Sequence, residues 1–110
     1  MTTVVVCKDR TGSYRGFTCM GHAGYARKGK ADILCAAISA LVIGTVNSLE
    51  ELAGERLCLK SNEQTGFIKC DFEDILQDRS SFLVDSMVFS LENLSRKYGS
   101  KYLQVKFEEV

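Results

Sequence analysis

One long apolar segment, residues 33–53, constrains the fold more than any other part of the chain. Its side chains recur at helical spacing on one stripe, formed by Leu34, Ile38, Leu41, Thr45, Leu49 and Leu52. Asp32 is a suitable N-cap before it, and Gly54 is a suitable stop after it. The most apolar part, residues 33–46, falls short of the ~20 residues that a membrane span requires. We therefore predict a buried core helix.

Shorter patterns surround this helix. β-Branched and alternating residues predict strands at residues 2–7, 14–20, 56–60, 66–72 and 101–108, with a polar turn at 61–65 making the third and fourth a hairpin. A second helix is expected to begin near Ser80 or Ser81, with Asp78 as an alternative cap, and to stop at Gly99. Its apolar face would comprise Val84, Met87, Val88, Leu91 and Leu94. The order ββαββαβ predicts an α+β fold: a mainly antiparallel sheet with two helices.

Composition narrows the functional classes. A chain of 110 residues with 45% hydrophobic residues has the size of one domain, residues 1–110. Equal numbers of basic and acidic residues, 14 each, give no basic excess, so we expect no direct binding of nucleic acid. The N-terminus lacks a signal-peptide pattern, and we expect neither a membrane segment nor a bound metal or cofactor, because metal-ligand spacings and phosphate-binding glycine loops are missing.

The cysteines point to a reducing compartment. There are five, an odd number, and none forms a C-x-x-C pair, which is typical of reduced thiols in the cytoplasm. Four of them, Cys7, Cys19, Cys58 and Cys70, fall in predicted strands and are assigned to the core.

The only histidine, His22, is predicted at a strand end, and Cys35 at the start of the long helix. The helix terminus favours a thiolate by ~0.3–1 kcal/mol, whereas a histidine that takes the thiol proton as imidazolium has a larger effect. The pair therefore suits a Cys-His nucleophile. The residues alone leave another interpretation open, in which Cys35 is a small buried hydrophobe and His22 is a satisfied strand-end side chain.

Two residues near this pair, Asp32 and Ser39, each allow two interpretations. Asp32 could orient His22 or only cap the helix, and the cap is favoured from the residues alone. Ser39 lies one turn after Cys35, where its hydroxyl could approach the nucleophile or simply pack against a neighbouring element. The segment 24–31, with two glycines and three basic residues, predicts an exposed, mobile loop.

The block Gly21-His22-Ala23-Gly24-Tyr25-Ala26, followed by Asp32-Ile33-Leu34-Cys35-Ala36-Ala37-Ile38-Ser39, resembles the paired signature of the ribosomal-processing cysteine protease Prp family of Firmicutes and related bacteria. The resemblance implies a homodimeric protease that removes a short N-terminal extension from a large-subunit ribosomal protein, cutting after an aromatic residue. It implies Cys35 as nucleophile, His22 as base, and Asp32 and Ser39 as supporting residues. It also implies substrate contacts at Gly21, Gly24 and Ala31, with loop 24–31 ordering over the substrate.

For such an enzyme we expect acyl transfer by a dyad, with N–H groups at the start of the Cys35 helix as oxyanion donors, because no downstream Asn or Asp resembles a third member. Two other classes stay open. A non-catalytic ribosome-associated interaction protein would tolerate loss of Cys35, and a redox-sensing thiol protein would use Cys35 without cleaving peptides.

Overall fold

The computed structural model describes residues 1–26 and 32–110. Within these residues the elements follow one another as β1 (Thr2–Lys8), β2 (Tyr14–Met20), α1 (Ile33–Asn47), a π-helical turn η1 (Ser48–Leu52), β3 (Leu57–Asn62), β4 (Phe67–Phe72), α2 (Asp78–Tyr98) and β5 (Leu103–Glu109). The predicted order ββαββαβ is confirmed.

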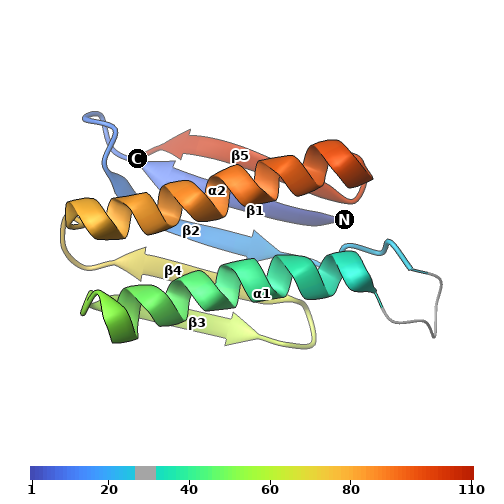
Figure 1. Ribbon diagram of the computed structural model, residues 1–110, viewed down its shortest axis with the longest axis horizontal. Helices are drawn as coiled ribbons and strands as arrows, with labels where there is room; N and C mark the ends of the chain where they lie inside the picture. Colours follow the sequence, from blue (N-terminus) through green and yellow to red (C-terminus); the bar gives the residue numbers. More distant parts are fainter. Residues whose placement is uncertain (27–31) are drawn as a thin grey trace.

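The strands form one five-stranded sheet in the order β3-β4-β2-β1-β5. Only β1 and β5 are parallel, because α2 returns the chain across the sheet before β5 begins; the other neighbouring pairs are antiparallel. Both helices lie on the same face of the sheet, side by side (Figure 1). The sheet is thus mainly antiparallel and covered on one face, as predicted.

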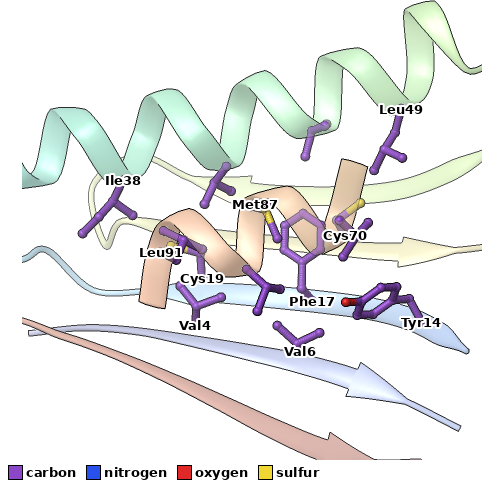
Figure 2. Packing of buried hydrophobic residues seen from close by; sticks show 14 of the residues in the cluster. Val4, Val6, Tyr14, Phe17, Cys19, Ile38, Leu49, Cys70, Met87 and Leu91 are labelled. Atoms are coloured by element: carbon purple, nitrogen blue, oxygen red, sulfur yellow. The ribbon is translucent and has the colours of Figure 1, made fainter. Parts of the chain in front are cut away.

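The core lies between the sheet and the two helices (Figure 2). Phe17 of β2 and Met87 and Leu91 of α2 are nearly or fully buried there. Helices α1 and η1 contribute five buried apolar side chains, spaced by four residues and, at the last step, by three: Leu34, Ile38, Val42, Val46 and Leu49. The predicted stripe is therefore wrong in part. Leu41 and Thr45 lie beside it and are half-buried.

Leu52 departs furthest from its prediction, since it is 77% exposed. The helix does not keep one period to its end: it changes from α to π over residues 48–52. A π turn inserts an extra residue into the repeat and so rotates the residues that follow it. Leu49 therefore stays in the core while Leu52, three residues later, faces solvent.

The helical segment continues beyond its most apolar part, residues 33–46. Ile33–Leu52 spans 20 residues with a mean hydropathy of 1.8, which satisfies a membrane span by length and composition alone. In the structure one side of this segment packs on the sheet, with Leu34, Val42 and Leu49 almost completely buried. It is the core helix of a sheet-and-helix fold, as predicted.

Several boundaries differ from the prediction. Helix α2 begins at Asp78, with Gln77 at the N-cap position, so Asp78 is a first-turn residue rather than the cap. Strand β3 continues to Asn62, which shortens the turn to residues 63–66. Strand β5 begins at Leu103, because the backbone N–H of Tyr102 donates to Gly99 in a turn that precedes it.

The four strand cysteines do not share one environment. Cys19 and Cys70 are buried as predicted, and burial, as the main cause, raises their pKa values to about 11 and about 12. Cys7 is only half-buried and Cys58 is exposed, so their assignment to the core is wrong. Cys58 is opposite the exposed Asp71, on the edge strand β3 and on the face that the helices leave open.

Candidate active site

Three segments meet at one end of the sheet: the end of β2, the start of α1 and the turn between β3 and β4 (Figure 1). His22 follows β2 by two residues, and Cys35 is in the first turn of α1. The His22 Nδ1 atom lies 4.0 Å from Cys35 Sγ, the upper limit for a hydrogen bond to sulfur. The predicted pair is brought together, with His22 exposed and Cys35 half-buried.

Asp32 is the N-cap of α1. Its Oδ1 accepts the backbone N–H of Cys35 at 2.9 Å, and its Oδ2 accepts those of Tyr25 at 2.9 Å and Ala26 at 3.5 Å. Partial burial on its own would raise the pKa of this carboxyl, but the backbone hydrogen bonds outweigh it and the net shift is downward. Among the described contacts Asp32 binds backbone rather than His22, so the prediction of a cap is confirmed.

The cap affects the expected oxyanion site. A backbone N–H donates one strong hydrogen bond at a time, and that of Cys35 is taken by Asp32 Oδ1. The Cys35 N–H is therefore not free to bind an oxyanion while the cap is in place, and the expectation of oxyanion donors among the N–H groups at the start of α1 stays a prediction.

The segment before the cap is anchored by an aromatic contact. The Tyr25 ring packs edge-to-face on Tyr98 at the end of α2, at 5.1 Å between centroids, and on Tyr102 before β5, at 5.2 Å. Residues 27–31, including Ala31 and most of the loop predicted to be mobile, lie outside the described residues. The described beginning of that loop is fixed by two sets of contacts. The Tyr25 ring packs on α2 and on the turn before β5, and Asp32 Oδ2 accepts the backbone N–H groups of Tyr25 and Ala26.

A cavity of about 360 Å³ adjoins the His22–Cys35 pair. The predicted residues Gly21 and Ser39 line it, whereas Gly24 does not. The inner wall is mostly apolar, and Ser61, Asn62 and Glu63 of the hairpin supply polar groups. The apolar part of its lining comprises Cys19, Ile38, Val42, Ile43, Val46, Leu59, Phe67 and Ile68. Such a hollow beside a thiol can hold an apolar side chain of a bound peptide.

The hairpin contributes two groups that the sequence did not indicate. The Gln64 carbonyl oxygen lies 3.2 Å from His22 Nε2, and Gly66 packs against Gly21 and the His22 ring. The available signal was a glycine closing a polar turn, which predicts a hairpin but not its neighbour. Only the pairing of β4 with β2 brings that turn to His22.

Asp32 caps α1 through Oδ1 and binds the preceding segment through Oδ2, and substitutions can separate these two functions. Asp32→Ala removes both sets of hydrogen bonds and should lower the free energy of unfolding by about 1 kcal/mol, the usual effect of losing an N-cap. Asp32→Asn keeps one carbonyl oxygen for the Cys35 N–H but loses the second acceptor, so its loss should be within about 0.5 kcal/mol. Urea unfolding measures both, and equal losses would contradict the assignment.

The same carboxylate gives a pH dependence. Folding lowers the pKa of Asp32, so its stabilising contribution is complete above the unfolded value of about 3.9 and is lost as the pH falls through the folded value. The stability advantage of the wild type over Asp32→Asn should therefore disappear in acid.

Three comparisons agree with this geometry. Residues 1–104 match the family model described as cysteine protease Prp. The chain is 34% identical over 86 residues to the ribosomal processing cysteine protease Prp of Bacillus subtilis, covering 74% of this chain and 76% of the relative.

Solved structures of Prp from S. aureus are similar over the whole fold. The complex with a covalently linked product peptide superposes with a TM-score of 0.89, at 25% identity, over 98% of this chain and 100% of that one. The complex with a substrate peptide has a TM-score of 0.86 at the same identity and coverage. The chain therefore belongs to the Prp family of ribosomal processing cysteine proteases.

Proposed function

We propose that the protein is an endopeptidase that removes the short N-terminal extension of a large-subunit ribosomal protein, cutting after an aromatic residue. The observation that carries the proposal is the approach of Cys35 Sγ to His22 Nδ1, at 4.0 Å, on the rim of an apolar cavity. The S. aureus relative, solved with a substrate peptide and with a covalently linked product peptide, supports covalent chemistry on a peptide.

In this mechanism the Cys35 thiol passes its proton to His22 Nδ1 as the sulfur attacks the scissile carbonyl carbon. The tetrahedral intermediate collapses, the C–N bond breaks, and the imidazolium protonates the leaving amine. Water, deprotonated by His22, then attacks the thioester, releases the new carboxylate and restores the thiol. The protons in these steps pass between the thiol, His22, the leaving amine and water.

The cavity supports a preference for an aromatic side chain before the cut. Its apolar wall begins one turn beyond Cys35, at Ile38, and continues along α1 and β4. Gly21 and Ser39, which line it, would contact the substrate. We propose substrate contacts at Gly24 and Ala31 on the basis of the family resemblance alone.

We also propose a cytoplasmic homodimer. The five cysteines are free thiols, which suits a reducing compartment. Phe82 and Phe89, two turns apart on α2, are 71% and 65% exposed and offer an apolar surface to a second copy. Sedimentation equilibrium would measure the association.

The test is cleavage of a synthetic peptide that spans the extension of the ribosomal protein from the same organism. Mass spectrometry should find two products, cut after the aromatic residue. A matched peptide with alanine at that position should be cleaved about 100-fold more slowly, because the apolar cavity loses its occupant. Binding without any product would contradict the proposal and favour an interaction protein.

A further inference from the structure

The turn between β3 and β4 contacts the base of the proposed dyad. The Gln64 carbonyl oxygen lies 3.2 Å from His22 Nε2, on the opposite side of the ring from Cys35. A carbonyl oxygen accepts hydrogen bonds and cannot donate them, so Nε2 must carry the hydrogen. In the neutral imidazole Nδ1 is then the unprotonated nitrogen, and it is the nitrogen that faces Cys35 Sγ.

The turn itself is held in place. Asn62 Oδ1 accepts the backbone N–H of Gln64 at 3.0 Å and of Thr65 at 3.4 Å, and Gly66 donates its N–H to the Glu63 carbonyl at 3.3 Å. These bonds fix the direction of the Gln64 carbonyl independently of His22. The acceptor is therefore positioned before the imidazole meets it.

Gly66 sets the distance between the turn and the histidine. Cys19 pairs with Ile68, and continuing this antiparallel register by two residues brings Gly21 opposite Gly66. A Cβ at position 66 would lie 2.7 Å from the Gly21 carbonyl oxygen and 3.1 Å from His22 Cε1. Gly66 also has a φ of +65°, which favours glycine. A side chain here would push the turn away from the ring.

We infer that the β3–β4 turn is the third part of the catalytic apparatus, with the Gln64 backbone carbonyl orienting His22 and Gly66 acting as a positioning residue. The inference rests on the proposed function and extends it, because the sequence offered no Asn or Asp for this place. The carbonyl selects the tautomer that can take the thiol proton at Nδ1, and it keeps its hydrogen bond when His22 becomes imidazolium.

The titratable groups around the ring do not compete for this assignment. Asp32, at the start of α1, is bound to backbone N–H groups, and Glu63, in the turn, lines the cavity. In the described parts of the chain neither carboxylate is hydrogen-bonded to His22, whose ring nitrogens face Gln64 and Cys35. A backbone carbonyl does not titrate, so the pH–rate profile should contain no ionisation from an orienting carboxylate.

The first test needs no substitution. Nitrogen-15 NMR of the His22 ring, recorded above about pH 8 where an ordinary histidine is neutral, should report the Nε2–H tautomer. The Nδ1–H tautomer would overturn the inference. Because this measurement requires no cleavage, it decides the inference even if the ribosomal peptide is not the substrate.

The second test compares two glycines. Gly54 has nearly the same φ as Gly66, +68° against +65°, but a Cβ there would meet no atom within 4 Å. Gly66→Ala and Gly54→Ala thus carry the same backbone strain, and only the first displaces the turn from His22. Gly66→Ala should lower kcat about 100-fold, as expected for an impaired base, whereas Gly54→Ala should retain wild-type cleavage.

Alkylation of Cys35 by iodoacetamide supplies a readout independent of substrate. The rate of alkylation at neutral pH should fall in Gly66→Ala, as in His22→Ala, and remain unchanged in Gly54→Ala. Wild-type kcat and a wild-type alkylation rate in a folded Gly66→Ala would overturn the inference. If Gly66→Ala does not fold, the tautomer of the wild type still decides it.

Discussion

Replacing Cys35 by alanine should abolish peptide cleavage while leaving the fold in place. The substitution removes the atom that forms the thioester, so cleavage should fall by at least about 10³-fold, equivalent to about 4 kcal/mol of transition-state stabilisation. Cys35 is half-buried at the edge of the core, so the loss of one sulfur should have little effect on packing. Cleavage rates by mass spectrometry and unfolding by urea measure the two effects separately.

A matched control is available on the other face of the sheet. Cys7 is also half-buried, but it points away from the helices and the cavity, so Cys7→Ala should retain wild-type cleavage. His22→Ala should lower the rate by about 10²–10⁴-fold, the usual contribution of a general base. Near wild-type cleavage by Cys35→Ala would show that another group is the nucleophile.

The approach of His22 to Cys35 was predictable because both residues lie at the ends of well-marked elements. A strand with the aromatic residues Tyr14 and Phe17 ends before His22, and Asp32 marks the start of the helix that contains Cys35. A strand end and the following helix start lie at the same edge of a sheet when the connection is short. Local patterns were therefore sufficient for the pair and for the cap.

The orienting carbonyl was not predictable by the same route. The Gln64 oxygen is a backbone atom that carries no residue-type signal, and it reaches His22 across a separation of 42 residues. Its position depends on β4 inserting between β2 and β3 in the sheet, whereas the sequence indicated only that β3 and β4 form a hairpin. Non-local strand order, rather than any local pattern, decides which turn faces the histidine.

The exposure of Cys58 also depends on non-local structure. Residue type favours burial of Cys58 as much as of Cys70, yet Cys58 is on an edge strand and points to the face without helices. Alternation along a strand separates the two faces but does not say which of them the helices cover.

Two leucines at the end of the long helix, Leu49 and Leu52, should differ strongly in how much their truncation lowers the free energy of unfolding. Leu49 and Leu52 lie on one predicted stripe, so the sequence predicts that truncating either leucine removes core packing. In the structure Leu49 is 0% exposed and Leu52 is 77% exposed, because the last turn is a π-helix. Leu49→Ala should leave a cavity and lower the free energy of unfolding by about 2–5 kcal/mol, whereas Leu52→Ala should change it by no more than about 0.5 kcal/mol.

Urea unfolding of both variants, followed by circular dichroism, measures the difference directly. A loss of about 2–5 kcal/mol is a large part of the stability of a small domain, so Leu49→Ala should be markedly easier to unfold at unchanged m-value. Equal losses from the two truncations would mean that the helix keeps a regular α period to its end in solution, which would return Leu52 to the core. A large loss confined to Leu49 is the result expected from the π turn, in which Leu49 is buried and Leu52 faces solvent.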